Sequence, residues 1–402
     1  MRGLAFQERD AAKVPVPQAL RIDTCWSAAE GLGLIDTMRG AEFQARHVLL
    51  ALEAGEPYRV ARALAMEVPY SAVAGARARR RTAELLEAAS SAAARVRQPY
   101  TDGLVTFARG AAAYLEGDFR SSITHCQEAE TILRDRCAGA VWVLDTTRIF
   151  LLRGLIYLGQ LNELCARLSS LMAQAQERGE RLSAMFLQTN IAYLEHLRAD
   201  RPDQAAEDIA AALKQWPRRK FDLPHFWALH GFVETHLYTG DGERAYRLIQ
   251  EQWSSLKRSL HLLTQIVSIE AYDFRARSAL AAARSAAVTS RQRATYLAAA
   301  EADARRIERQ GAAWALPLAR LIRGGLANAH GRTADALAHM EAAEEGFERQ
   351  GMALHVAACR RRRGETMGGD VGRAHIEAAD AWMRSQQVKD PARLTAMIAP
   401  GR

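Results

Sequence analysis

The sequence predicts an all-α protein in which antiparallel helical hairpins stack into a solenoid. Amphipathic helical runs alternate with turn residues, small residues recur at fixed distances from those turns, and no segment alternates as a β-strand does. With 402 residues, 49% of them hydrophobic, the chain can bury a large core. A chain of this length would suit two or three domains, but repeats that pack on their neighbours form one continuous core.

The clearest unit is centred on Gly331, between two amphipathic helical runs. Small residues and one bulky residue stand at fixed distances on either side of this turn: Gly324, Ala327, Ala336, Ala343 and the bulky Met340. Small residues at such positions let two antiparallel helices cross closely, while the bulky residue packs between neighbouring hairpins. This is the pattern of a tetratricopeptide repeat (TPR).

The pattern recurs along the chain, with turns at Gly117, Gly159, Asp200, Gly240, Gly331 and Gly369. Most intervals are about 40 residues, longer than the roughly 34 residues of a standard TPR. We therefore predict a TPR-like right-handed α-solenoid of about nine antiparallel hairpins with a period of about 40 residues. Near Gly117 the bulky position is held by Cys126, so we expect this thiol in the core rather than paired with His125 as a nucleophile.

The predicted organisation is an N-terminal tail at 1–16, a helical-repeat domain at 17–388 and a C-terminal tail at 389–402. The tail from 390 onward is expected to hold at most one short helix. The helices and hairpins of the repeat domain are expected at 17–33, 37–54, 57–68, 71–97, 99–137, 140–178, 181–216, 225–239, 243–258, 261–286, 290–310, 313–330, 333–349, 352–366 and 371–387.

Charge, cysteine content and hydropathy indicate which partners and which cellular compartment to expect. A net charge of +8 permits an acidic partner, but the charge is spread over the chain. Five scattered cysteines without CxxC spacing argue against a disulfide framework or structural zinc, and they fit a reducing cytosol. No apolar run approaches the ~20 residues of a membrane span, and the N-terminus lacks the apolar core of a signal peptide. We expect a cytoplasmic protein with no membrane partner.

Catalytic motifs are missing from the sequence. It has no GxxxxGK[ST] phosphate loop and no kinase HRD or DFG triplet, so we expect no enzyme, no catalytic residue and no cofactor. The triplet Gly117-Asp118-Phe119 is interpreted as a repeat turn. His230 and Glu234, four residues apart on one helix, could ligate a metal, but the HExxH order is not met and no third ligand is evident. We expect these two side chains to pack or to face a groove.

Two basic clusters interrupt the pattern, Arg360–Arg363 and Arg218–Lys220. Nucleic-acid binding would need basic side chains along one stripe with aromatic residues between them. These clusters lie far apart in sequence, and four consecutive arginines wrap around a helix, so nucleic acid is an unlikely partner. A solvated face is the default interpretation of both clusters.

The concave face of a solenoid is its natural binding surface. Residues of the first helix of each hairpin, chosen by their distance from the turn, are expected to face this groove and bind a protein or peptide: Phe107, Tyr114, Arg153, Tyr157, Asn190, Arg198, Trp227, His230, Glu234, Tyr238 and Asn328. Aromatic, amide and charged side chains together suit an extended or helical peptide. The alternative is that half of them serve inter-repeat packing.

Several stretches resemble one family, and together they span the chain from about Pro17: Arg21–Ala29, Arg39–His47, Ala54–Leu64, Ala113–Gly117, His125–Cys126, Tyr238–Gly242, Ala379–Met383 and Asp390–Arg393. The family is the C-terminal helical-repeat region of large bacterial proteins that join a eukaryote-like Ser/Thr protein kinase to a STAND/AAA-type ATPase. The resemblance implies a sensor or regulatory scaffold, with the kinase or ATPase module as one candidate partner. The alternatives are a fragment of a Ser/Thr kinase whose catalytic domain lies outside this chain and, less favoured, a nucleic-acid-binding repeat.

Overall fold

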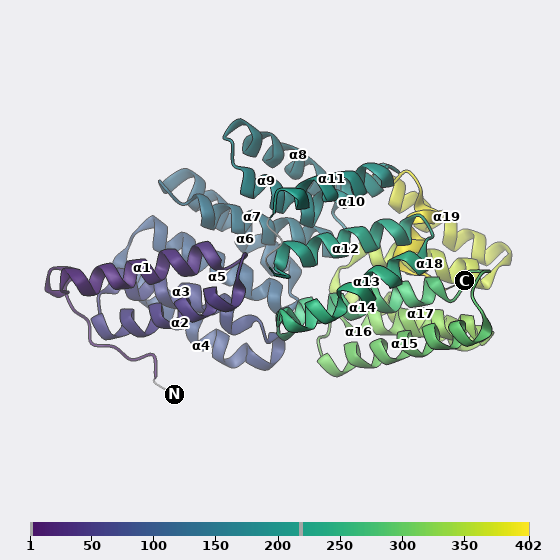
Figure 1. Ribbon diagram of the computed structural model, residues 1–402, viewed down its shortest axis with the longest axis horizontal. Helices are drawn as coiled ribbons and strands as arrows, with labels where there is room; N and C mark the ends of the chain where they lie inside the picture. The colour runs from purple at the N-terminus through teal and green to yellow at the C-terminus, as the bar shows by residue number, and fades with distance from the viewer. Residues whose placement is uncertain (1–2, 217–219, 402) are drawn as a thin grey trace. The chain divides into compact units, whose positions relative to one another are not determined.

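The computed structural model describes residues 3–216 and 220–401, and every regular element within these ranges is a helix (Figure 1). The all-α prediction is therefore confirmed for the described part of the chain. Arg218 and Arg219 of the predicted basic loop lie outside the described residues, and Lys220 beside them is exposed. None of the helices in the described ranges combines the length and the apolar character needed to cross a membrane.

The chain divides into two compact units, which we call unit 1 (Met1–Gly154 with Leu263–Ile266) and unit 2 (Leu155–Leu262 with Val267–Arg402). Unit 1 contains, in order, η1 (Ala11–Lys13), α1 (Val16–Leu32), α2 (Thr37–Ala54), α3 (Pro57–Ala72), η2 (Gly75–Ala78), α4 (Arg79–Val96), α5 (Pro99–Glu116), α6 (Phe119–Arg136) and the larger part of α7 (Val141–Leu158).

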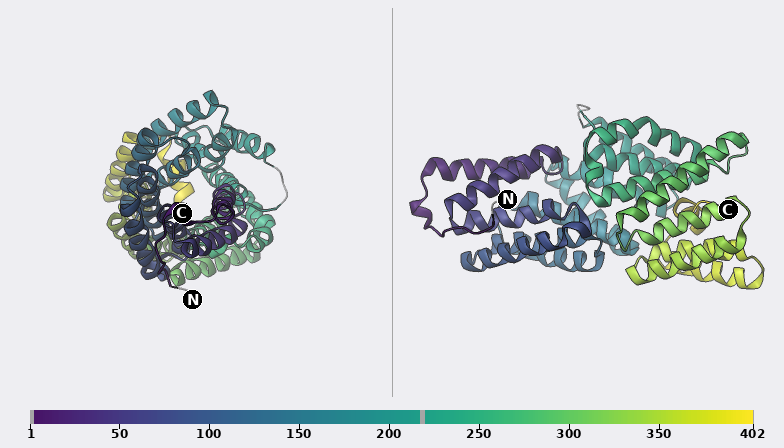
Figure 2. Two further views of the ribbon diagram at one scale, coloured as in Figure 1. Left: turned by 90° about the vertical axis from the view of Figure 1, so that its left-hand side faces the viewer. Right: turned by 90° about the horizontal axis from the view of Figure 1, so that it is seen from below.

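Unit 2 begins with the end of α7 and contains most of the remaining elements: α8 (Leu161–Glu177), α9 (Arg181–Leu187), the π-helical turn η3 (Gln188–Ala192), α10 (Tyr193–Arg198), α11 (Pro202–Lys214), α12 (Leu223–Tyr238), α13 (Gly242–Arg258), η4 (His261–Leu263), α14 (Gln265–Ala282), α15 (Ser290–Gln310), α16 (Leu316–Ala329), α17 (Thr333–Gln350), α18 (Ala353–Met367), α19 (Gly369–Ser385) and α20 (Pro391–Ile398). Within each unit, helices that follow one another in sequence pack side by side as hairpins (Figure 2).

Aspartates at the start of several helices explain where those helices begin. The side chains of Asp36, Asp118, Asp241 and Asp390 each accept a hydrogen bond from the backbone N–H three residues later, at the first turns of α2, α6, α13 and α20. This contact satisfies one of the N–H groups that a helix start leaves unpaired, and the negative charge suits the helix dipole. The same short polar residue thus defines helix starts in both units.

Close helix crossings lie at small residues. A Cβ added at Gly110 would lie 2.6 Å from the Sγ of Cys126, and one added at Gly324 would lie 3.0 Å from the Cγ of Met340. The turns between these helix pairs are Gly117 and Gly331, with φ of 86° and 72°, a region that glycine adopts without strain. Cys126 is fully buried, which confirms its predicted place in the core.

The prediction of one continuous helix over 71–97 is wrong. The chain breaks between α3 and α4, where Gly75 has a φ of 61°. A side chain at Gly75 would collide with Gln265, whose backbone N–H donates to the carbonyl of Val73 at 2.8 Å. The break therefore depends on a residue far along the sequence, which local helical periodicity does not report.

Candidate functional site

In unit 1 the candidate residues Phe107 and Tyr114 pack against Phe150, and the candidate Arg153 bonds Tyr114. The Phe150 ring meets Tyr114 at 5.2 Å and Phe107 at 5.9 Å between centroids, both edge to face. Arg153 Nε donates to the hydroxyl of Tyr114 at 2.9 Å, and the three candidate side chains are all buried. In this unit the residues selected for a groove contribute to the core between α5 and α7.

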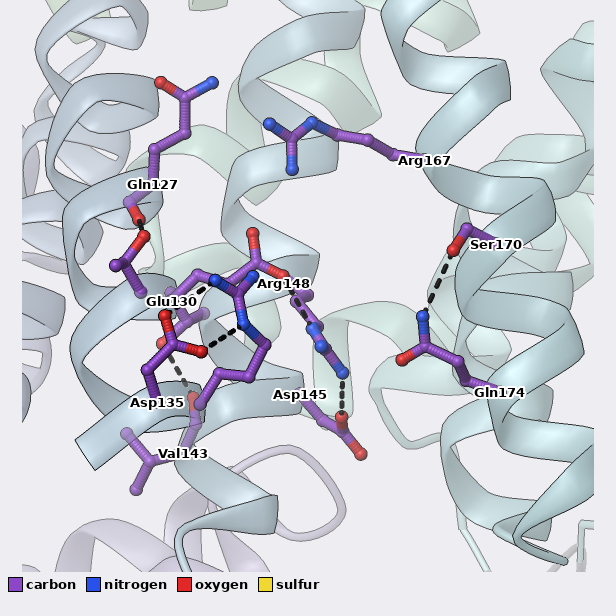
Figure 3. A network of polar contacts seen from close by, with 12 residues as sticks. Gln127, Glu130, Asp135, Val143, Asp145, Arg148, Arg167, Ser170 and Gln174 are labelled. Atoms are coloured by element: carbon purple, nitrogen blue, oxygen red, sulfur yellow. Dashed lines mark hydrogen bonds and ion pairs between the residues drawn. The ribbon is translucent and has the colours of Figure 1, made fainter. Parts of the chain in front are cut away.

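A buried ion pair lies near this aromatic core. Arg148 on α7 donates through Nε to Glu130 on α6 at 2.9 Å and through Nη1 to Asp145 at 3.5 Å (Figure 3). Arg148 and Glu130 are both less than 9% exposed. The pair links two successive helices, and the sequence analysis did not single out either residue.

In unit 2 four of the candidates pack between helices. The hydroxyl of Tyr157 donates to Glu270 at 2.5 Å, and its ring meets Trp314 edge to face at 5.3 Å. Asn190 is buried in the π-helical turn, and Trp227 contacts Phe186. Asn328 reaches the next hairpin, where its Nδ2 donates to Thr366 at 3.1 Å. These contacts are those expected of inter-repeat packing.

The remaining four candidates are Arg198, His230, Glu234 and Tyr238. Arg198 and Tyr238 contact a stretch that we call the C-terminal segment, residues 386–401, and Glu234, which bonds His230, is linked to it through Arg277. Its short helix α20 packs on α12, α18 and α19, and Figure 1 shows the yellow end of the chain close to α12 and α18. The segment is buried through side chains at helical spacing, with Leu394 at 0%, Met397 at 4% and Ile398 at 6% exposure. A single short helix after 390 is confirmed.

The first contacts hold the start of the segment against α10 and α12. Arg198 Nη1 donates to the carbonyl of Gln386 at 3.3 Å, and the carbonyl of Arg198 accepts the N–H of Lys389 at 2.9 Å. The guanidinium of Arg393 lies 4.9 Å from the ring centre of Tyr238 and bonds Asp200 at 2.6 Å. The Tyr238 hydroxyl donates to the same carboxylate, so Asp200 links α12 to the segment.

Arg277 on α14 binds the middle of the segment. Its Nη1 donates to the carbonyl of Met397 at 2.8 Å and to Glu234 at 3.1 Å, while its Nε donates to Asp273 at 2.7 Å. Arg277, Glu234 and Asp273 are all buried. One guanidinium thus satisfies two buried carboxylates and a main-chain carbonyl of another helix, as its fork of donors allows.

The end of the segment is held by α16 and α18. Arg362 Nε donates to the carbonyl of Ala399 at 2.7 Å, and its Nη1 pairs with Glu365 at 2.5 Å. A Cβ at Gly325 would lie 2.9 Å from the carbonyl oxygen of Pro400, and Gly401 packs against the backbone of Gly325. Gly325 therefore allows the segment to approach the helix backbone closely.

The two carboxyl groups beside Arg277, those of Glu234 and Asp273, have pKa values shifted in opposite directions. Burial alone would raise the pKa of Glu234, but the charge of Arg277 and hydrogen bonds from His230 and Arg277 outweigh it and lower the pKa to about 2. At Asp273 burial prevails over Arg277, and its pKa is raised. The pKa of Arg277 is raised because attraction to both acids outweighs its own burial. Arg277 is therefore the cation that compensates both buried carboxyl groups.

His230 Nε2 and Glu234 Oε1, the pair considered for a metal, lie 3.0 Å apart. Glu234 is already engaged by Arg277 through both carboxylate oxygens. Within residues 3–216 and 220–401, no group of three or more His, Cys, Asp or Glu side chains is arranged to hold a metal ion.

The solvated face expected of Arg360–Arg363 is wrong. Arg360 and Arg363 both pair with Glu344 of α17, at 2.7 and 2.9 Å. Arg361 pairs with Asp380 of α19 at 2.8 Å and with Glu365, and Arg362 binds the C-terminal segment. Because four consecutive residues point to all sides of a helix, these arginines join α18 to three neighbours.

The sequence analysis did not single out Arg277 or Gly325, interpreted Arg362 as part of a solvated face, and gave the short helix after 390 no role in the site. A signal for the segment was present: Asp390-Pro391 is a helix start, and Leu394, Met397 and Ile398 form one apolar face.

No family model matches the chain, and a search of the curated proteins finds no match.

Proposed function

We propose that the chain is a non-catalytic scaffold, a TPR-like right-handed solenoid with a period of about 40 residues, whose unit 2 binds a segment of a partner protein. The observation that carries this proposal is the way in which unit 2 binds residues 386–401. The helices α10, α14 and α18 each place an arginine on a main-chain carbonyl of that segment, at Gln386, Met397 and Ala399 respectively. We call the surface that these helices form with α12 and α16 the unit 2 groove.

The chemistry of this groove favours a peptide over a small molecule. Main-chain carbonyls are present in any polypeptide, so arginine donors supply affinity that does not depend on sequence. Specificity then comes from the sites that receive Leu394, Met397 and Ile398, which are apolar. A contact surface of this kind spans several repeats, as is usual where a solenoid binds an extended partner.

We further propose, from the family resemblance of the sequence, that the scaffold is the sensor or regulatory region of a cytoplasmic Ser/Thr kinase–ATPase signalling protein. The alternative is that the chain is a fragment of such a kinase, with its catalytic domain elsewhere. The nucleic-acid alternative loses support because Arg360–Arg363 are engaged by carboxylates and by the C-terminal segment.

A random peptide library displayed on phage tests the scaffold proposal directly. We expect the immobilised full chain to enrich short peptides with an apolar helical face. In the Leu394→Asp variant described below, whose own segment is weakened, adding Arg198→Ala, which removes one carbonyl donor, should weaken their binding, whereas adding Arg247→Ala on the exposed face of α13 should leave it unchanged. Circular dichroism would verify that both variants fold. The proposal would be contradicted if neither the full chain nor the Leu394→Asp variant described below enriched any peptide.

A further inference from the structure

We propose that residues 386–401 are an intramolecular ligand, which occupies the unit 2 groove until a partner protein displaces it with a segment of the same chemistry. This inference rests on the proposed peptide-binding function and adds to it the kind of partner and a mode of regulation. The partner segment is a short amphipathic helix, uncharged along its buried face, with a capped start like Asp390-Pro391 and leucine, methionine or isoleucine at helical spacing.

The way the segment is held suggests that it can leave. Three of its main-chain carbonyls are bound by arginine side chains, and two of these arginines also pair with carboxylates of the groove: Arg277 with Glu234 and Asp273, and Arg362 with Glu365. Those acids remain beside the guanidinium groups when the segment departs, so its release strands no buried cation. The charges of Arg277 and Arg362 thus keep their carboxylate partners in the emptied groove, and water can replace the lost carbonyls.

The contact of Arg393 with Asp200, at the exposed side of the segment, is also one that a partner could replace. Arg393 pairs with Asp200, and their side chains are 39% and 37% exposed. A partly exposed ion pair contributes little, because water competes for both charges. The stacking of Arg393 on Tyr238 adds a contact that another cationic or aromatic side chain could reproduce.

One position shows where a partner could bind better than the segment does. Thr395 is fully buried, and its hydroxyl has no hydrogen-bond partner among the described residues. A buried hydroxyl without a partner disfavours binding, so valine, which has the same shape without the polar atom, should fit this position more tightly. A partner segment with valine or isoleucine here would displace the intramolecular one.

Displacement couples the affinity for a partner to the stability of the bound segment. The groove is available only in the fraction of molecules whose segment has left, so the apparent Kd exceeds the intrinsic Kd by the inverse of that fraction. Weakening the segment should therefore strengthen partner binding, and tightening it should do the reverse.

The test uses a fluorescein-labelled peptide of residues 386–401 and fluorescence anisotropy with the full chain. Leu394→Asp places a charge at a fully buried position of the segment and should lower the apparent Kd for the peptide about tenfold or more. Thr395→Val in the chain should raise the apparent Kd several-fold. Leu182→Asp, the same substitution at an exposed leucine of unit 2, is the matched control and should leave the Kd at the wild-type value.

Arg393→Ala is a second variant for the case in which Leu394→Asp does not fold. It alters only partly exposed contacts of the segment, and it should also lower the apparent Kd, by a smaller factor. Equal affinity of the peptide for wild type, Thr395→Val and Arg393→Ala would overturn the inference, as would binding that occurs only with a shift from monomer to dimer by light scattering. If the phage library yields ligands while this peptide binds none of the folded variants, the inference fails and the scaffold proposal stands.

Discussion

Buried arginines bond different acceptors in the two units: Arg153 is the example in unit 1, and Arg277 and Arg362 are the examples in unit 2. In unit 1, Phe107 and Tyr114 pack against Phe150, and Arg153 Nε donates to the hydroxyl of Tyr114 on α5. In unit 2, Arg277 and Arg362 are shared between carboxylates and main-chain carbonyls of a segment from the end of the chain. Arg153 thus bonds a side chain of the surrounding helices, whereas Arg277 and Arg362 each bond a carboxylate and a main-chain carbonyl of the segment.

Arg277→Met should have the largest effect and should separate the units. The substitution leaves Glu234 and Asp273 buried without their cation, which costs about 3–5 kcal/mol of unfolding free energy. Hydrogen exchange by mass spectrometry should show lost protection in unit 2 and retained protection in α2 and α3. Arg247→Met, on an exposed face, should change neither unit. Equal loss of protection in both units would contradict the comparison.

The pH dependence of unit 1 should follow His47. Burial, and then the charge of Arg62, lower the pKa of this histidine from 6.5 to about 3. The unfolded chain therefore binds a proton that the folded chain refuses, so stability falls as the pH drops from 6.5 towards 3. At pH 5 the loss from this group is about 2 kcal/mol. Urea unfolding at pH 7 and pH 5 should show this difference in wild type, and His47→Gln should reduce it; an unchanged difference would refute the assignment.

Two matched glycine substitutions test how tightly the helices cross in each unit. Gly110→Ala in unit 1 places a methyl group 2.6 Å from the Sγ of Cys126, a short and fully buried side chain that cannot move away. We expect a cost of about 1–3 kcal/mol. Gly324→Ala in unit 2 meets Met340 at 3.0 Å, and this flexible side chain can adjust while alanine favours the helix, so the change should be within about 1 kcal/mol of zero. Thermal unfolding followed by circular dichroism would measure both, and a larger loss for Gly324→Ala would reverse the comparison.

The smallest expected effect is that of Arg393→Ala, which removes a partly exposed ion pair with Asp200. The global stability should fall by no more than about 1 kcal/mol. The amides of α20 should nevertheless exchange faster, because this contact fastens the segment and contributes little to the surrounding helices. Unchanged exchange in α20 would show that the pair does not hold the segment.

These differences show which features a sequence can predict. Turns at Gly117 and Gly331 and the burial of Cys126 follow from local spacing, because helical periodicity and glycine conformation are properties of a short window. The break at Gly75 is set by Gln265, and the carbonyls bound by Arg277 and Arg362 lie 120 and 37 residues away. Contacts between distant residues leave no periodic trace, so a buried arginine and an exposed one look alike in the sequence.

The C-terminal segment shows the same limit at the level of the site. Its amphipathic pattern, Leu394, Met397 and Ile398, was readable, yet the pattern does not say which surface receives it. Two predicted groove residues, Arg198 and Tyr238, contact the segment, Glu234 and His230 are linked to it through Arg277, and the other seven pack elsewhere. Distance from a turn selects positions on a helix, but which of those side chains meets the segment depends on the packing of the neighbouring helices.

Native-state hydrogen exchange of the unmodified full chain tests the central claim most directly, because a displaceable ligand and a permanent part of the core open differently. We predict that the amides of α20 exchange at least about tenfold faster than those of α12 and α18, through an opening that leaves those helices protected. Exchange of α20 at the same rate as α12 and α18, in one cooperative step, would show that residues 386–401 belong to the core and would contradict the account.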